Sequence, residues 1–125
     1  MDVAQALSDL TEISSQIREA VVVDGSGSVL GASGGSERLA EAGLRLLEEG
    51  KRAGTGEPTQ LEASTHQGSV FVLRDGGRTI VATTGPEPTV GLVFYDLKSC
   101  LKAIGEEPPK RKRAPRKKKE TDGAA

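Results

Sequence analysis

Apolar residues near the start of the chain recur every three or four positions, which predicts an amphipathic helix. They are Val3, Leu7, Leu10, Ile13 and Ile17. Asp2 stands directly before them and is predicted to be the N-cap. The same spacing returns over 36–50 and again over 90–104, so the chain is expected to form three helices. Ser36 and Thr89 are placed to cap the second and third of these helices, and Gly105 follows the last turn of the third.

Strand patterns fill the segments between the predicted helices. A β-branched run at 20–23 and an apolar pair at 29–30 are separated by the turn sequence Asp-Gly-Ser-Gly, which predicts a β-hairpin. From Thr59 to Thr84, three further runs with strand character are separated by turn sequences at 66–68 and 75–77. These three runs predict an antiparallel meander.

The predicted order is therefore helix, strand, strand, helix, strand, strand, strand, helix. Hairpin connections dominate this order, so we expect an α+β sandwich with a mainly antiparallel five-stranded sheet and helices on its faces. One domain spanning 1–105 accounts for all the predicted elements.

The charge is distributed very unevenly, although the whole chain of 125 residues carries a formal charge of only −1. Residues 1–105 hold nine basic and fourteen acidic residues, whereas 106–125 hold eight basic and four acidic residues. The segment 106–125 also lacks large apolar residues, so it is predicted to be a disordered basic tail. Its basic residues are candidates for contact with a polyanion: Lys110, Arg111, Lys112, Arg113, Arg116, Lys117, Lys118 and Lys119.

The composition also indicates the cellular compartment in which the protein is expected. The single cysteine, Cys100, excludes a disulfide within the chain, and no apolar run reaches the ~18 residues that suggest a membrane span. The first ten residues are acidic and amphipathic, unlike a secretory signal. We expect a cytoplasmic protein.

One motif suggests serine hydrolase chemistry. The run Gly31-Ala32-Ser33-Gly34-Gly35 matches the G-x-S-x-G nucleophile elbow and lies between a strand and a helix. The single histidine, His66, falls in a predicted hairpin turn, and the chain lacks the crossover helices of a parallel sheet. We interpret the run as a flexible connection before the second helix.

Other candidate chemistry is equally incomplete. The glycines from Gly25 to Gly35 could cradle a phosphate, but their spacing matches neither the dinucleotide fingerprint nor the P-loop. His66 and Cys100 are too few ligands for a structural zinc site. The sequence therefore predicts a protein that is not an enzyme, with no cofactor, no metal and no small-molecule substrate.

The second predicted helix carries small residues among its leucines, which lets another element approach its backbone closely. Either a second copy of the chain packs against this helix, or Gly43 lets the helix pack closely on its own sheet. The helix presents more apolar surface than one side of a sheet needs, which favours a homodimer; the residues on its neighbouring faces are Leu39, Gly43, Leu46, Leu47 and Gly50.

The pattern over 1–105 resembles the Roadblock (dynein light chain) family, in its bacterial branch of predicted regulators of Ras-like GTPases. The resemblance rests on the run AVVVDGSGSVLGAS at 20–33, the second helix, the meander and the run GLVFYDL at 91–97. It implies a profilin-like sandwich that forms homodimers by pairing second helices and joining third strands, here 59–65, edge to edge. The candidate dimer-interface residues that follow from this are, on the helix, Leu39, Ala42, Gly43, Leu46, Leu47 and Gly50, and, on the strand, Leu61 and Ala63. The basic tail is not part of the family pattern.

The resemblance also implies a function. Members of the family act as platforms that bind small Ras-like GTPases and influence their nucleotide cycle or location. We therefore expect a non-catalytic dimeric scaffold for such a GTPase, in a bacterial signalling or polarity system. The alternative is a dimerising adaptor whose basic tail binds nucleic acid or an anionic membrane surface, and a small-molecule sensor of related shape is a third hypothesis.

Overall fold

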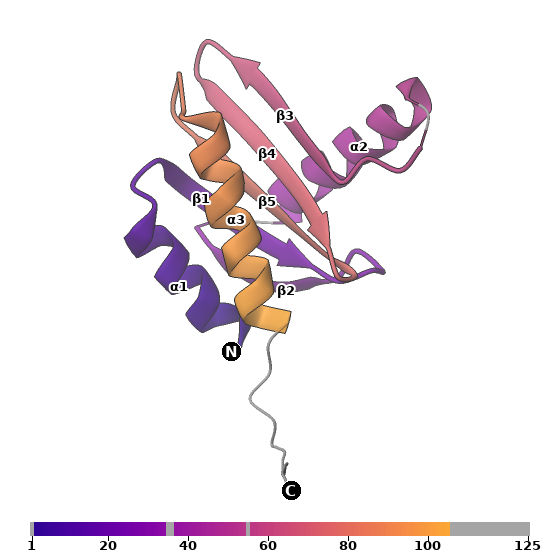
Figure 1. Cartoon of the computed structure of the whole chain (residues 1–125). Helices are drawn as coiled ribbons and strands as arrows, with labels where there is room; N and C mark the ends of the chain where they lie inside the picture. The colour runs from indigo at the N-terminus through magenta and orange to yellow at the C-terminus, as the bar shows by residue number, and fades with distance from the viewer. Residues whose placement is uncertain (1, 35–36, 55, 106–125) are drawn as a thin grey trace, which may run out of the picture.

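The structure is a computed structural model, and it describes residues 2–34, 37–54 and 56–105. Figure 1 shows three helices arranged around one twisted sheet. In chain order the elements are α1 (Val3–Ile13), β1 (Ile17–Val23), β2 (Val29–Ser33), α2 (Glu37–Ala53), β3 (Gln60–Thr65), β4 (Gly68–Asp75), β5 (Arg78–Thr84) and α3 (Val90–Gly105). This is the predicted order.

The five strands form one sheet in the order β2-β1-β5-β4-β3, and every neighbouring pair of these strands is antiparallel. The meander β3-β4-β5 pairs without a break, from Gln60 opposite Leu73 to Asp75 opposite Arg78. The N-terminal hairpin then joins this meander through β1 and β5. Strands β2 and β3 are consequently the two edges of the sheet.

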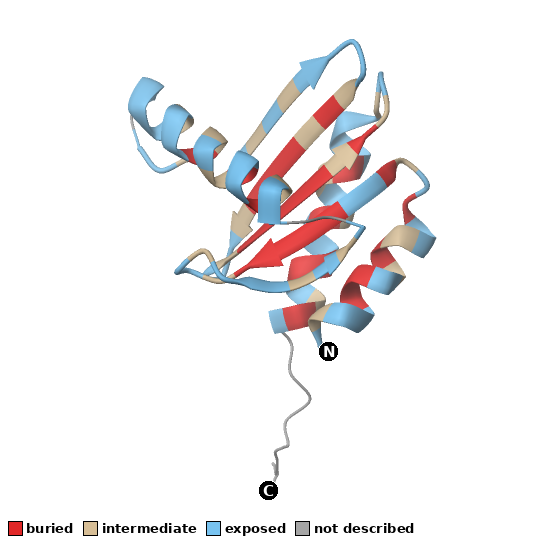
Figure 2. Cartoon of the chain, turned by 180° about the vertical axis from the view of Figure 1, so that it is seen from behind, coloured by how far each residue is buried: buried red, intermediate tan, exposed pale blue. Residues whose placement is uncertain are grey.

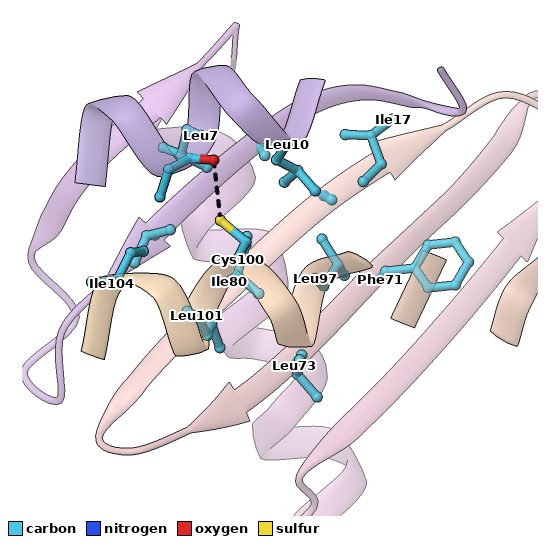
Figure 3. Packing of buried hydrophobic residues seen from close by; sticks show 14 of the residues in the cluster. Leu7, Leu10, Ile17, Phe71, Leu73, Ile80, Leu97, Cys100, Leu101 and Ile104 are labelled. Atoms are coloured by element: carbon cyan, nitrogen blue, oxygen red, sulfur yellow. Dashed lines mark hydrogen bonds between the residues drawn. The ribbon is translucent and has the colours of Figure 1, made fainter. Parts of the chain in front are cut away.

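The helices form two layers, with α1 and α3 on one face of the sheet and α2 on the other (Figure 1). The larger core lies under α1 and α3 and is built from side chains such as Leu7, Phe71, Ile80 and Leu97, all at 0% exposure (Figure 3). The smaller core lies under α2 and contains Val21, Val23, Val72 and Val81 from the three central strands. Because both faces of the central strands are covered, these strands read as continuous apolar runs rather than as alternating ones.

Helix α1 begins as predicted and ends earlier than predicted. The Asp2 carboxylate accepts a hydrogen bond from the backbone N–H of Gln5 at 2.8 Å, so Asp2 is the N-cap. The helix stops at Ile13, where Ser14 turns extended, and Ile17 is the first residue of β1 rather than part of the helix. The prediction for Ile17 was wrong because the spacing of its apolar side chain also fits a helix. Ile17 belongs to β1 and is buried in the core that α1 covers.

Helix α3 has the predicted bounds. The carbonyl of Thr89 accepts from the N–H of Val93 at 3.0 Å, as an N-cap carbonyl does. Ser36, the predicted cap of α2, and the predicted disordered tail at 106–125 lie outside the described residues. Within the described ranges, none of the helices is both long enough and apolar enough to cross a bilayer.

Candidate interaction site

Helix α2 lies unusually close to the sheet at Gly43. A β-carbon at this position would stand 2.8 Å from Cγ1 of Val81 and closer still to its Cγ2. Val81 is fully buried in β5, the central strand of the sheet. Only glycine therefore lets the helix backbone approach the sheet this closely, which is the second of the two interpretations of Gly43 that the sequence allowed.

One flank of α2, called the free flank, is only partly covered by this packing. Leu39, Ala42 and Leu46 follow helical spacing and form a stripe beside the sheet-facing stripe of Gly43 and Leu47. Ala42 is exposed, whereas the two leucines are half-buried. The opposite flank, at Leu44, borders the tight turns at one end of the strands. The free flank therefore faces toward the other end of the strands.

A hollow occupies that other end of the sheet, on the same face as α2. Its walls come from four strands and include Glu19, Ala63, Val70 and Thr83. Thr83 donates to the Glu19 carboxylate at 3.5 Å, so this part of the face is more polar than the part that α2 covers. Figure 2 shows the same side of the molecule, with α2 largely exposed above the buried strands. Helix α2 therefore leaves part of this face of the sheet uncovered. This uncovered strip is the hollow lined by Glu19, Ala63, Val70 and Thr83.

Strand β3 adds a free edge next to this strip. It pairs with β4 along its length and has no second neighbour among the described strands. Leu61 and Ala63 are both half-buried. Leu61 packs against the core under α2, and Ala63 lies two residues further on the same face. Gly50 faces Leu61 and Pro58, since a β-carbon there would lie 3.1 Å and 3.2 Å from their side chains. The end of α2 and the start of β3 are therefore packed together.

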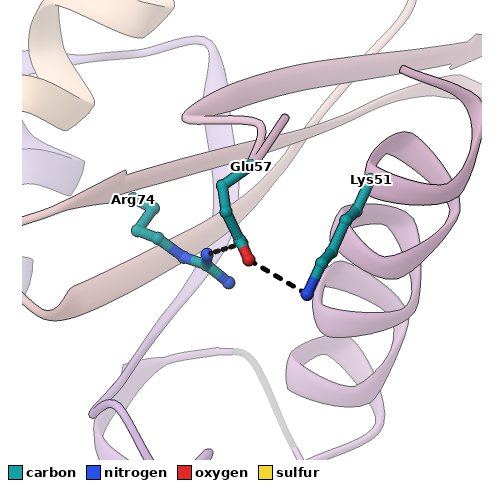
Figure 4. Close-up of polar contacts among 3 residues, drawn as sticks. All are labelled: Lys51, Glu57 and Arg74. Atoms are coloured by element: carbon teal, nitrogen blue, oxygen red, sulfur yellow. Dashed lines mark hydrogen bonds and ion pairs between the residues drawn. The ribbon is translucent and has the colours of Figure 1, made fainter. Parts of the chain in front are cut away.

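Ion pairs reinforce the junction between α2 and β3. The Glu57 carboxylate contacts Lys51 Nζ at 3.1 Å and Arg74 Nη1 at 2.9 Å, and so links α2, the loop before β3, and β4 (Figure 4). Hydrogen bonding from Lys51, then from Arg74, lowers the pKa of Glu57 below its ordinary value. Lys51 and Glu57 are exposed and Arg74 is half-buried, so these pairs position the loop more than they stabilise the fold.

The eight residues predicted for a dimer interface thus divide into two groups. Gly43, Leu47 and Gly50 pack inside the protomer against its own sheet and loop. Of the other five, Ala63 lines the hollow and Ala42 is exposed, whereas three leucines are half-buried against the core under α2: Leu39, Leu46 and Leu61. Sequence reasoning missed Glu19, Val70 and Thr83 in the hollow, although the period of two along β4 and β5 places Val70 and Thr83 on the face that carries Leu61.

The candidate catalytic residues are far apart in the sheet. Ser33 ends β2 at one edge, while His66 is exposed in the turn after β3, at the other edge. Gly31 serves packing, because a β-carbon there would lie 2.6 Å from Cγ1 of Val3 in α1. Gly35 lies outside the described residues. The described part of the G-x-S-x-G run is thus a strand packed under a helix, without a histidine near its serine.

The glycine-rich turn after β1 is organised by its own aspartate. The Asp24 carboxylate accepts from the N–H groups of Ser26 at 2.9 Å and Ser28 at 3.0 Å, and from the Ser26 hydroxyl at 2.7 Å. These bonds, led by that of the Ser26 hydroxyl, lower the pKa of Asp24. The amides of Ser26 and Ser28 are thus bound to this carboxylate, and the amide of Gly27 donates to the Asp24 carbonyl at 3.0 Å, so these three amides are not free to bind a phosphate.

The candidate metal ligands are also separated. Cys100 is buried between α3 and α1, where its thiol donates to the Ala6 carbonyl at 3.6 Å (Figure 3), whereas His66 is exposed beyond β3. Over the described ranges, no three His, Cys, Asp or Glu side chains cluster as metal ligands would. The eight basic residues from Lys110 to Lys119 lie outside the described residues.

Taken together, the fold and the site define an α+β sandwich with an open sheet edge and a helix whose flank borders an uncovered strip of sheet. Comparisons with solved structures identify this architecture as the roadblock fold. Two Roadblock/LC7 domain structures from Streptomyces avermitilis match with TM-scores of 0.74 and 0.65, at 19% and 25% identity. They cover 84% and 80% of this chain, and 96% and 95% of those chains. The resemblance inferred from the sequence is confirmed.

MglB of Myxococcus xanthus also matches, with a TM-score of 0.58 at 17% identity over 83% of this chain and 84% of that one. Profilins share the fold as well, which confirms the predicted fold class. Comparison of the sequence with models of protein families gave no match, and comparison with curated proteins gave none either. The likeness to roadblock domains is thus a likeness of structure, at 25% sequence identity or less in the structures named above.

Proposed function

We propose that the chain is a non-catalytic homodimeric scaffold that binds and regulates a small Ras-like GTPase. The single observation that carries the dimer is the uncovered strip of sheet, which is lined by four strands without any residue of α2 and reaches the edge strand β3. A second α2 fits such a strip, and a second β3 satisfies such an edge, whose unpaired backbone groups would otherwise invite aggregation. One structure of the related fold, MglB, is described as a tetrameric arrangement, which supports self-association as a property of this architecture.

The GTPase is proposed from the resemblance to the bacterial branch of the Roadblock family, and the MglB matches support it. A protein without a catalytic group can regulate a GTPase only by binding one of its nucleotide states more tightly than the other. A dimer would present two copies of each surface around one two-fold axis, which suits a platform for a partner.

The dimer can be tested with Ala42→Glu. Ala42 is exposed in the protomer, so the substitution leaves the fold intact, yet it would place two carboxylates in a contact between two α2 helices. We expect monomers by sedimentation velocity, with an unchanged circular dichroism spectrum. Ala4→Glu is the matched control, since Ala4 is an exposed helical alanine on the opposite face of the sheet and its substitution should leave dimers. An Ala42→Glu protein that stays dimeric would contradict the proposed interface.

The GTPase can be tested by affinity capture with the full chain, at moderate salt, with GDP or a GTP analogue added. We expect a small Ras-like GTPase to be retained in one nucleotide state more than in the other. Calorimetric titration of the purified GTPase in each state then measures the difference in affinity. Equal affinity in both states, or no binding in either, would refute regulation while leaving the dimer intact.

The alternative adaptor function is separable by salt. Binding of the basic tail to nucleic acid or anionic lipid should fall steeply between low and moderate salt, because it releases counterions. Capture of nucleic acid that depends on 106–125, with no GTPase retained, would favour this alternative. The uneven charge distribution is the observation that supports it.

A further inference from the structure

A shallow groove of about 160 Å³ runs between α1 and α3, on the face of the molecule opposite α2. Its floor is apolar, since Leu10 and Cys100 lie beneath it. Ile13 forms one wall and is 75% exposed, so an apolar side chain is left in water at the edge of the groove. An exposed isoleucine beside an apolar floor is a surface that another segment can cover.

The charged residues that line this groove are both acidic. Asp9 of α1 and Asp96 of α3 stand on its two sides. The Asp9 carboxylate accepts only from the neutral side chain of Gln5, at 2.9 Å, and neither aspartate is paired with a basic side chain among the described residues. Asp9 and Cys100 line the same groove, and, after burial, the charge of Asp9 is the second cause that raises the pKa of Cys100 to about 11.

The chain itself supplies a basic segment at one end of this groove. Ala103 lines the groove and lies two residues before Gly105, the last residue of α3. The end of α3 lies beside the start of α1 (Figure 1). Asp96 is nine residues back along α3 from Gly105, which is about 14 Å at the helical rise of 1.5 Å per residue. Lys110 is five residues beyond Gly105, and an extended chain of that length reaches about 17 Å. The run from Lys110 to Lys119 can therefore turn back and lie beside both aspartates.

We propose that the basic segment 110–119 binds within the same chain to the groove between α1 and α3. The aliphatic stems of its lysines and arginines would cover Ile13 and the apolar floor, while their charged ends reach Asp9 and Asp96. Each exposed ion pair is weak, but the short connection holds the segment at a high effective concentration beside the groove. The segment is then held on the face opposite α2. This proposal does not depend on the proposed GTPase function.

Paramagnetic relaxation in NMR tests the contact on the full chain. A maleimide nitroxide is attached at pH 7 to the thiol introduced by Ala114→Cys, in the middle of the basic run. Cys100 is buried and has a raised pKa, so we expect it to stay unlabelled. Treating the wild-type chain with the same reagent checks this, because mass spectrometry should then show no added nitroxide. We expect loss of amide signal intensity at Asp9, Ile13, Asp96 and Ala103, and little loss along α2.

Charge variants provide the matched comparison. Asp9→Asn with Asp96→Asn should restore the intensity of the groove amides, because the acceptor charges are removed while the shape is kept. Glu41→Gln with Glu48→Gln removes the same charge from exposed positions of α2 and should leave the losses unchanged. Salt at 1 M, where the Debye length is about 3 Å, should also restore the intensity.

Three results would overturn the proposal. The first is uniform intensity, or losses centred on α2 or β3, which would place the segment elsewhere. The second is losses that persist in the Asp9→Asn, Asp96→Asn protein, which would make the contact independent of these charges. The third comes from mixing unlabelled ¹⁵N chains with nitroxide-bearing ¹⁴N chains. Losses as strong in that mixture would show that the segment binds a second copy rather than its own chain.

Discussion

Replacing Gly43 by alanine tests whether this glycine serves the protomer or an interface between protomers. The added methyl group would overlap both methyl groups of Val81, a fully buried residue on a strand that is paired on both sides. Overpacking of this kind costs about 1–3 kcal/mol. Alanine also favours the helix over glycine by about 1 kcal/mol, which offsets part of that cost. We expect a net destabilisation of up to about 2 kcal/mol.

A double-mutant cycle isolates the contact. In a Val81→Ala background the two methyl groups are gone, so Gly43→Ala should there stabilise the protein by up to about 1 kcal/mol through helix propensity alone. The coupling free energy between the two positions should therefore equal the overpacking cost, about 1–3 kcal/mol. Gly91→Ala in α3 is the control for propensity, since nothing lies within 4 Å of a β-carbon there, and it should not destabilise.

Urea unfolding at a fixed protomer concentration measures these free energies, because the stability of a dimer depends on concentration. Sedimentation of each variant gives its oligomeric state under the same conditions. A Gly43→Ala protomer of unchanged stability that no longer forms dimers would refute this reasoning and would assign Gly43 to the interface instead.

Three further predictions concern titrating groups. Cys100 has its pKa raised from 9.0 to about 11, so at pH 8 its thiolate fraction, and hence its reaction with a thiol reagent, should be about 100-fold lower than for an exposed cysteine; comparable rates would show that the thiol is not buried. The lowered pKa of Asp24 means that its stabilisation is present above pH 3.8 and is lost as pH falls through its folded pKa. The urea midpoint of the Asp24→Asn protein should therefore depend less on pH in that range than the midpoint of the wild-type protein. Parallel plots of midpoint against pH for the two proteins would contradict this. Glu57→Gln should raise the rate of amide hydrogen exchange at the start of β3 and leave the rate in α1 unchanged, because Glu57 links the loop before β3 to Lys51 and Arg74. An unchanged rate at the start of β3 would contradict this prediction.

The sequence predicts the order of the elements because each carries its own local signal. Apolar spacing indicates the helices, and glycine-rich turns separate the strands. The end of α1 was misplaced because Ile13 and Ile17 keep helical spacing, although the chain leaves the helix at Ser14 and Ile13 is exposed. When a helix and the strand that follows it are buried in the same core, the spacing of apolar residues alone does not show where the helix ends and the strand begins.

The site was predicted less well than the fold, for a physical reason. The spacing of α2 identifies which residues share a stripe, but the approach of Gly43 to Val81 depends on a contact between distant segments. The same holds for the hollow, because Glu19 and Thr83 meet only when β1 pairs with β5. The edge position of β3 could be inferred only from the resemblance, since the order of strands in a sheet is not a local property.

The two open edges of the sheet have a consequence for how copies can assemble. Joining β3 to β3 uses the same edge of both copies and closes the assembly at two, whereas joining β3 to β2 would leave a free edge at each end and extend without limit. Strand β2 is a poor template for such growth, because it has five residues, its pairing with β1 is interrupted by a bulge, and α1 packs against it. The asymmetry between the two edges therefore favours a finite particle over a fibre.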